Sequence, residues 1–201
     1  MDLAVVALTF AAIFVVELPD KTFIATLVLS TRYRPLLVWV GVGLAFFLQV
    51  LIAVTAGRLA TLLPETLVRG VAAVIFLLGA VLLFRAAPGA AEEEEHAEQA
   101  YTAKVAGDTK RGLRAVAASF LVLFAAEWGD LSQLLTVSLV ARYEQPLAVF
   151  TGAWLALLAV SGVAVLAGRV LLRHIRLSAL HYTGAVVCLL LAGLTVYDLV
   201  G

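Results

Sequence analysis

Two pairs of acidic residues lie in the middle of long apolar stretches of this sequence. Glu17 and Asp20 are part of LAVVALTFAAIFVVELPDKTFIATLVLS, and Glu127 and Asp130 are part of LFAAEWGDLSQLLT. The spacing of i and i+3 places both carboxylates of a pair on one face of a helix. An ionisable side chain inside a membrane costs about 3 kcal/mol on insertion scales, so such residues are rare there and mark functional sites. We therefore predict that these four carboxylates bind a metal ion.

A purely structural role is the alternative for the four carboxylates, because buried polar groups also hydrogen-bond helices together in lipid. Serine or asparagine would do the same without the cost of a charge. The acidic residue type therefore favours a binding site over a structural one.

Neutral oxygen donors accompany these carboxylates at comparable depth in the apolar stretches. They are Thr22, Thr26, Gln49, Ser132 and Gln133. Carboxylate, amide and hydroxyl oxygens are hard ligands that suit Mn²⁺, Ca²⁺ or Mg²⁺, whereas zinc and copper sites favour nitrogen and sulfur. The three histidines all fall in predicted loops or at span ends, so we expect no zinc site and no prosthetic group. Packing between helices is the alternative role for Gln49.

The residues between the two acids of each pair are expected to interrupt the helix. Pro19 lacks an N–H and its ring crowds the preceding turn, and Gly129 takes the equivalent place in the second stretch. A kink at these positions would expose backbone carbonyl oxygens as further ligands. Lys21 lies at i+4 from Glu17, where it either neutralises an empty site or only offsets the charge of Glu17.

Six apolar stretches of the chain are long enough to cross a membrane, which takes roughly 20 residues each. They cover about residues 3–29, 36–56, 66–84, 113–140, 147–167 and 180–200. The composition agrees, because 63% of the 201 residues are hydrophobic and 14% are charged, whereas soluble domains are about 45 to 50% apolar. We predict an all-α integral membrane protein with six transmembrane helices.

The two halves of the chain repeat one another at an offset of 110 positions. The matched pairs include Glu17 with Glu127, Asp20 with Asp130, Thr26 with Thr136 and Arg32 with Arg142. Each repeat contains three spans, an odd number, so the second repeat must enter the membrane in the opposite sense. Inverted-topology repeats of this kind are common in secondary transporters, whose sites lie near the membrane midplane at the repeat interface.

A polar segment separates the two repeats and sets the predicted domain boundaries, with repeats at 1–84 and 113–201 and an acidic linker at 85–112. The linker contains AAEEEEHAEQAYTAK, which is expected to form a solvated loop. Of the Lys and Arg residues outside the spans, ten lie on the linker side and three on the other side. The positive-inside rule therefore places the linker in the cytoplasm and both termini outside, in a plasma membrane.

The acidic segments resemble the doubled motif of a known family. ELPDKT and EWGDLSQ are similar to the pattern Glu, any residue, Gly, Asp, Lys or Arg, Ser or Thr of the cation exchangers typified by transmembrane protein 165, the uncharacterised protein family 0016. The resemblance extends over the six spans, the 3+3 repeat and the acidic central segment. It implies a transporter, not an enzyme, that moves Mn²⁺ or Ca²⁺ out of the cytosol in exchange for protons, with Glu17, Asp20, Glu127 and Asp130 at the acidic positions.

The sequence departs from this motif at two positions. Pro19 replaces the first glycine, and Leu131 replaces the second basic residue. The four carboxylates are therefore accompanied by one lysine instead of two basic residues.

Two other classes of function remain open at this point. An exporter of a cationic organic solute, such as a basic amino acid, would also need carboxylates. An intramembrane enzyme is the third class, indicated by Asp198 near the end of the last span. The formal net charge of zero gives no basis for a nucleic-acid partner. The predicted partners are a divalent metal ion, protons and the lipid bilayer, and the sequence predicts no oligomeric state.

Overall fold

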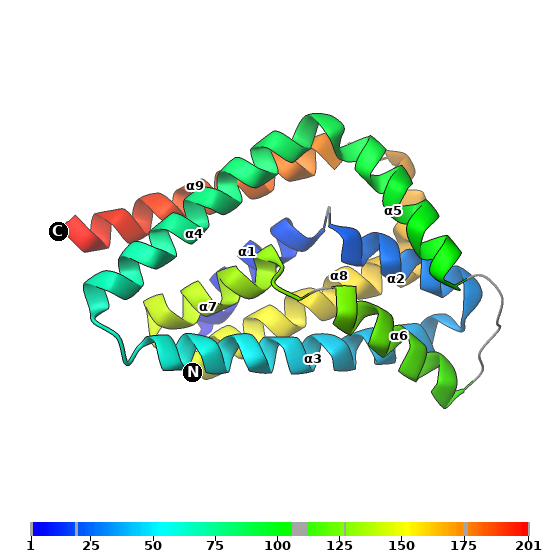
Figure 1. Ribbon diagram of the computed structural model, residues 1–201, viewed down its shortest axis with the longest axis horizontal. Helices are drawn as coiled ribbons and strands as arrows, with labels where there is room; N and C mark the ends of the chain where they lie inside the picture. Colours follow the sequence, from blue (N-terminus) through cyan, green and yellow to red (C-terminus); the bar gives the residue numbers. More distant parts are fainter. Residues whose placement is uncertain (1, 19, 106–111, 127, 175–176, 201) are drawn as a thin grey trace.

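The computed structural model is helical throughout the residues that it describes, which are 2–18, 20–105, 112–126, 128–174 and 177–200. The helices are α1 Leu3–Glu17, α2 Lys21–Arg32, α3 Pro35–Ala60, α4 Glu65–Ala86, α5 Ala90–Val105, α6 Leu113–Ala126, α7 Leu131–Tyr143, α8 Pro146–His174 and α9 Leu177–Val200. A short 3₁₀ turn, η1 (Ala87–Gly89), joins α4 to α5. Figure 1 shows an elongated bundle in which α9 ends far from α5.

Four helical segments of the described chain are long and apolar enough to cross a membrane individually. They are Pro35–Ala60, Thr66–Ala103, Pro146–Leu166 and His181–Leu199. Two pairs of shorter helices, α1 with α2 and α6 with α7, meet the same condition together, which gives six spans if each pair counts as one. Large apolar side chains such as Leu44 and Leu51 are exposed on the surface, as expected where lipid covers a protein. The predicted helical membrane fold is confirmed.

Both short helix pairs are sharply bent at the acidic segments. The bend is 71° between α1 and α2 and 73° between α6 and α7. Gly129 has a φ of +75°, a left-handed conformation that strains residues with a side chain. Asp20 starts α2 by accepting a hydrogen bond from the backbone N–H of Lys21. The predicted interruption of both helices is therefore confirmed, while Pro19 itself lies outside the described residues.

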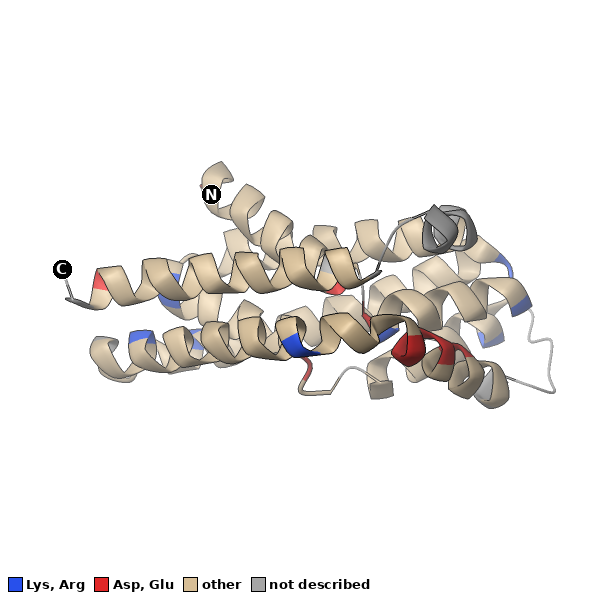
Figure 2. Cartoon of the chain, turned by 90° about the horizontal axis from the view of Figure 1, so that it is seen from above, with Lys and Arg blue, Asp and Glu red and all other residues tan. Residues whose placement is uncertain are grey.

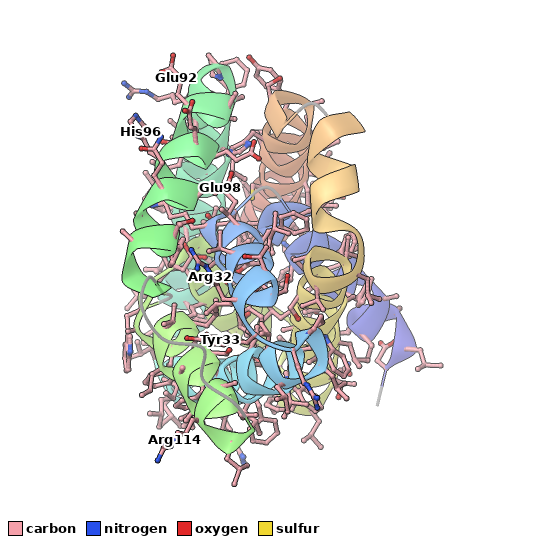
Figure 3. The ribbon with its side chains drawn as sticks, turned by 90° about the vertical axis from the view of Figure 1, so that its right-hand side faces the viewer. Arg32, Tyr33, Glu92, His96, Glu98 and Arg114 are labelled. Atoms are coloured by element: carbon pink, nitrogen blue, oxygen red, sulfur yellow. The ribbon has the colours of Figure 1, made fainter. Side chains whose placement is uncertain are left out.

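The segment between the two repeats contains a helix, so the prediction of a solvated loop over 85–112 is wrong. The helix α5 covers Ala90–Val105, and its alanine, glutamate and glutamine residues are strong helix formers. One face of α5 packs on α2, since Tyr101 is buried and Ala97 packs against the main core. Most acidic residues of α5, including Glu92, are exposed (Figure 3), and the acidic positions colour this helix red in Figure 2.

The two longest helices pack against each other in the middle of the bundle. α3 has 26 residues and α8 has 29, which corresponds to lengths of about 39 and 44 Å. The indole N–H of Trp39 donates to the Leu158 carbonyl at 3.0 Å, and the indole N–H of Trp154 donates to the Gly43 carbonyl at 3.1 Å. These two bonds fix how far α3 is shifted along α8.

The two halves of the chain touch each other through matched glycines. Gly41 of α3 faces α6, where an added Cβ would lie 2.4 Å from the Val116 carbonyl oxygen. Gly152 of α8 faces α1 in the same way, and an added Cβ would lie 2.6 Å from the Val6 carbonyl oxygen. Gly41 and Gly152 are 111 positions apart, one more than the offset of the acidic pairs, so the contacts agree with a repeat that carries a one-residue insertion. The opposite orientation of the two repeats in a membrane stays a prediction.

Candidate metal centre

Three carboxylates meet where the two bent helix pairs are interrupted. Glu17 ends α1, Asp20 precedes α2 and Asp130 precedes α7, and one oxygen of each lies within 4.8 Å of the other two. In the part of the chain that the structure describes, this is the one group of three or more His, Cys, Asp or Glu side chains with such a spacing. Three of the four predicted acidic residues are thus brought together from both repeats. Glu127, the fourth, lies outside the described residues.

Glu17 is the most deeply buried of these carboxylates, with 1% of its surface exposed. Its Oε2 accepts a hydrogen bond of 2.7 Å from the Thr22 hydroxyl. Its Oε1 is buried and has no hydrogen-bond partner. A buried polar oxygen without a partner carries a desolvation cost that a bound ion would remove. Glu17 therefore has one oxygen held in place and one available to a ligand.

Asp20 and Asp130 occupy equivalent positions at the starts of α2 and α7, but their contacts differ. Oδ1 of Asp20 accepts a hydrogen bond of 2.7 Å from the Lys21 backbone N–H. Asp130 makes no such capping bond, and its Oδ2 is 3.5 Å from the Ser132 hydroxyl. Both lie at the N-terminus of a helix, where the helix dipole stabilises negative charge.

The predicted supporting residues take several different roles. Thr22 and Ser132 are buried beside the carboxylates, and Ser132 also lies next to the Glu17 carboxylate. Gln49 donates from Nε2 to the Phe124 carbonyl at 3.2 Å, which ties α3 to α6. Gln133 accepts a hydrogen bond of 3.2 Å from the backbone N–H of Gly129 and so stabilises the turn before α7. Of these four residues, Thr22 and Ser132 are thus placed at the cluster, and the hydroxyl of Thr26 on α2 is buried without a hydrogen-bond partner.

Lys21 is exposed, so the structure does not place it in the cluster. The prediction rested on the i+4 spacing from Glu17, which brings two side chains together only within one continuous helix. The chain bends by 71° between the two residues. Thr22 was predicted as a neutral oxygen donor, but its bond to the Glu17 carboxylate, five residues earlier, was not foreseen. Pro19 was the sequence signal that helical spacing does not apply there.

The size and chemistry of the cluster fit a hard divalent cation. Ca²⁺ binds oxygens at about 2.3 to 2.6 Å, so two oxygens on one ion are at most about 5 Å apart. The three carboxylate oxygens satisfy this limit at 4.8 Å, and the cluster has no nitrogen or sulfur ligand. Three ionised carboxylates carry a charge of −3, and a divalent cation would leave −1. One bound proton would neutralise the remaining charge, which is costly to bury.

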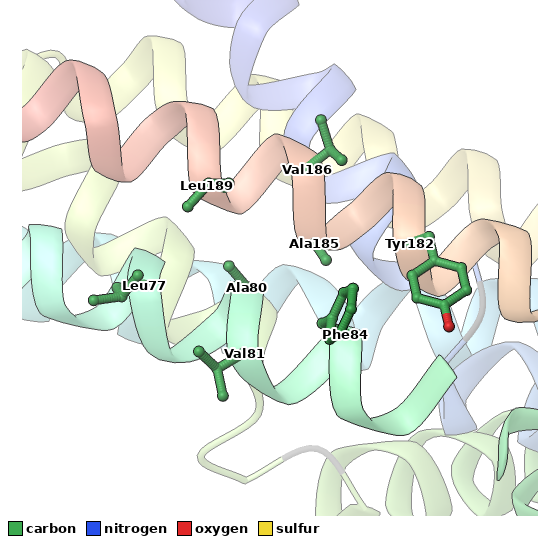
Figure 4. Close-up of a pocket in the computed structure, with 8 residues that line it drawn as sticks. All are labelled: Leu77, Ala80, Val81, Phe84, Tyr182, Ala185, Val186 and Leu189. Atoms are coloured by element: carbon green, nitrogen blue, oxygen red, sulfur yellow. The ribbon is translucent and has the colours of Figure 1, made fainter. Parts of the chain in front are cut away.

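A separate apolar groove lies between α4 and α9 and is not part of this cluster. It has a volume of about 360 Å³. Its lining side chains include Leu77, Phe84, Tyr182 and Leu189, and none of its lining residues is charged (Figure 4). Such a groove suits a hydrocarbon chain and offers no ligands to a metal ion.

A known family model matches both halves of the chain. It is the model of the divalent cation/proton antiporter GDT1, and it matches residues 5–91 and 115–201. The chain belongs to the GDT1 family. The resemblance indicated by the doubled acidic motif is therefore confirmed, and membership of the GDT1 family makes the chain a transporter instead of an enzyme.

Individual relatives of the GDT1 family support the same assignment. The chloroplastic protein PAM71 of Arabidopsis thaliana is 32% identical over 212 residues, which cover 96% of this chain and 57% of PAM71. GDT1-like protein sll0615 of Synechocystis sp. is 35% identical over 173 residues, which cover 79% of this chain and 82% of that protein. The chloroplastic GDT1-like protein 2 of Oryza sativa is 31% identical over 208 residues, which cover 94% of this chain and 59% of that protein. The chain thus spans less than two thirds of the length of these plant relatives. No solved structure shows a significant match.

Membership of the GDT1 family also bears on the remaining sequence predictions. Asp198 is no longer a reason to expect an intramembrane enzyme, because the family is one of transporters. The relatives include chloroplastic and cyanobacterial proteins, so the family does not specify one membrane. Location in a plasma membrane with both termini outside stays a prediction.

Proposed function

We propose that this protein exports Mn²⁺ or Ca²⁺ from the cytosol in exchange for protons, and that Glu17, Asp20, Glu127 and Asp130 bind the ion. The observation that carries the proposal is the meeting of three carboxylates at the interruptions of two bent helices. The family description supports a divalent cation and a proton as the exchanged ions. The excess of basic residues on the linker side supports a cytoplasmic linker, and export is the direction that the family resemblance implies.

Exchange follows from competition between the metal ion and protons for the same oxygens. The ionised carboxylates attract a divalent cation, and each proton that binds removes one negative charge and weakens that attraction. A proton arriving from the far side of the membrane therefore helps to release the cation there. Once the site is accessible from the cytosol again, the proton leaves to the cytosol and the carboxylate regains its charge.

Export of a cationic organic solute remains the alternative function. Three carboxylates with two hydroxyls would bind an ammonium group as well as a metal ion. The family description favours the inorganic ion, because the model that matches both halves of the chain is one of divalent cation antiporters. Lysine and arginine therefore belong in the transport assay as competitors.

Transport by the purified chain in proteoliposomes tests the proposal. A proton gradient should drive uptake of Mn²⁺ or Ca²⁺ against its concentration gradient, and each ion should inhibit uptake of the other. Zn²⁺ should bind poorly at this site because the cluster has only oxygen ligands. Lower pH should weaken metal binding, since protons occupy the same carboxylates. Glu17→Gln is the matched control, and gradient-driven metal uptake that persists in it, or inhibition by lysine but not by metals, would contradict the proposal.

A further inference from the structure

Two arginines tie the end of α9 to neighbouring helices at the end of the bundle away from α5. The Nη2 atom of Arg142 on α7 lies 2.6 Å from Oδ2 of Asp198 on α9. Its Nη1 donates to the Leu191 carbonyl at 3.4 Å and also to the Thr195 hydroxyl. Arg69 of α4 donates to the backbone carbonyl of Asp198 at 2.8 Å. The guanidinium of Arg142 therefore joins α7 to α9 at the point where α4 is also attached.

This ion pair is unevenly exposed, which distinguishes it from a pair on the protein surface. The Arg142 side chain is 9% exposed, whereas that of Asp198 is 42% exposed. The Nε atom of Arg142 is buried and has no hydrogen-bond partner. Removal of Asp198 would leave the nearly buried guanidinium of Arg142 without its charged partner, which is costly, and the best-attested use of such charges is in registry or switch elements. Asp198, the exposed member, is the one that water can reach first.

Arg142 lies at the opposite end of α7 from the carboxylate cluster. Asp130 precedes the first residue of α7, and Arg142 is next to its last residue. Twelve residues of helix separate them by about 18 Å. A valine of α7, Val140, packs so closely on α3 that a Cβ added to Gly57 would lie 2.7 Å from it. The C-terminal half of α7 therefore packs on α3 and α4, and Arg142 adds a polar tie from the end of α7 to α9.

Among the described residues, the matching half-helix of the first repeat shows no equivalent tie. Arg32 stands 110 positions before Arg142 in the sequence and near the end of α2. Arg32 is exposed, and α5 packs alongside α2 (Figure 3). The two ends of the bundle are thus closed differently, by an ion pair at the end of α7 and by the packing of a polar helix at the end of α2.

We propose that the ion pair of Arg142 and Asp198 is a latch that holds the C-terminal end of α7 against α9 and that breaks once in each transport cycle. Arg142 is a positioning residue, which acts on the metal ion only through the placement of Asp130 by α7. Opening of the latch frees the C-terminal end of α7 and exposes the cluster to the side of the membrane where α7 and α9 end. This inference rests on the proposed function, since it assigns the latch a place in that transport cycle.

Asp198→Asn is the main test, because it removes the charge of the exposed partner and keeps its shape. We expect Mn²⁺ or Ca²⁺ binding to the purified protein to change by less than about twofold, because Asp198 does not touch the cluster. The maximal transport rate should change by about fivefold or more with little change in KM, the signature of an altered conformational step. Arg32→Gln is the matched control and should leave both quantities unchanged.

Cysteine labelling supplies a measurement that a merely structural role would not alter. Cys188 is buried and is replaced by alanine, and Ser138, which is 2% exposed on α7, is replaced by cysteine as a reporter. A membrane-impermeant maleimide should label this cysteine about tenfold faster in Asp198→Asn than in the parent, because a tenfold shift in population requires only about 1.4 kcal/mol. Arg142→Lys, which keeps the charge, should label at an intermediate rate.

The outcomes separate the latch from the proposed function. Equal labelling rates and equal maximal transport rates in the parent and Asp198→Asn would overturn the latch. Loss of metal binding in Asp198→Asn with unchanged labelling would overturn it too, since Asp198 would then act on the site and not on α7. If the parent binds neither Mn²⁺ nor Ca²⁺, the proposed function fails, while the labelling rates still report whether the ion pair holds α7 against α9.

Discussion

The two helix interruptions carry the same acidic residues but are built differently. At the first, Asp20 caps α2 with its carboxylate, and Glu17 is held by Thr22. At the second, the turn is closed by Gly129 in a left-handed conformation and by Gln133, and Asp130 makes no capping bond. A duplicated motif therefore does not imply duplicated contacts: Asp20 also supports the helix that follows it, whereas Asp130 accepts the long bond from the Ser132 hydroxyl.

The residue after each aspartate adds a second difference. Lys21 is exposed, while Leu131 packs against α4, where a Cβ added to Gly79 would lie 3.0 Å from its Cδ1. The missing second basic residue therefore changes how α7 packs on α4, and the charge of the cluster itself depends on its carboxylates.

The largest expected effect on the transport rate comes from neutralising Glu17 and Asp130, the carboxylates that do not cap a helix. Glu17→Gln and Asp130→Asn should each lower the transport rate about 100-fold or more, because loss of one charged ligand removes roughly 3 kcal/mol of ion binding. Asp20→Asn should keep the stability of α2, since asparagine caps a helix as well as aspartate does, while transport falls. Metal uptake and thermal unfolding measure the two quantities. Near-normal uptake in any two of these variants would remove the cluster as the ion site.

A charge placed at Leu131 should act on stability instead of on the site. Leu131→Lys should lower the free energy of unfolding by about 2 to 3 kcal/mol, because it moves a lysine into an apolar helix contact. Lys21→Leu, the reciprocal change at an exposed position, should stay within about 0.5 kcal/mol. Thermal unfolding in detergent measures both. A stable Leu131→Lys protein whose metal binding shifts to lower pH would show instead that residue 131 faces the carboxylates.

The turn at Gly129 should tolerate a side chain poorly. Gly129→Ala should cost about 1 to 2 kcal/mol, because alanine is strained at a φ of +75°. Gly70→Ala is the matched control, since a Cβ at Gly70 meets no atom within 4 Å and alanine is preferred in a helix. Unfolding curves of the two variants should therefore move in opposite directions. Equal shifts would mean that the conformation of Gly129 does not matter for stability.

The smallest difference should be between the two hydroxyl groups. Thr22→Val should weaken metal binding about fivefold, because the 2.7 Å bond to Glu17 orients that carboxylate. Loss of a partner that orients a metal ligand typically lowers metal affinity about tenfold or more. Ser132→Ala should cost about twofold, since its distance to Asp130 is 3.5 Å. Titration of the purified variants with Mn²⁺ compares them. A larger effect of Ser132→Ala would show that the second interruption, and not the first, controls the geometry.

Much of the fold could be predicted from the sequence because its signals are local. The apolar stretches gave the helices, and Pro19 and Gly129 marked both interruptions. The helix α5 could not be predicted in this way, because a run of acidic residues also occurs in solvated loops. Whether it folds as a packed helix depends on burial of Tyr101 against α2, a contact between distant parts of the chain.

The candidate site shows the same division between local and distant information. The 110-residue offset predicted that Glu17 and Asp130 would approach each other, since matched segments of a repeat pack as partners. The directions of side chains next to the interruptions could not be predicted, because the helical spacing rule ends where the helix does. This is why Lys21 was expected in the cluster and why the contact of Leu131 with α4 was not foreseen.

The two tryptophan bonds between α3 and α8 have a mechanical consequence. Each indole donates to a carbonyl of the opposite helix, so a shift of one helix along the other by a single residue, about 1.5 Å, would break both bonds at once. We therefore expect the two long helices to move together as one rigid unit. The carboxylates lie at the interruptions of the short bent helices on either side of it. We expect these short helices to move during the transport cycle while α3 and α8 keep their relative position.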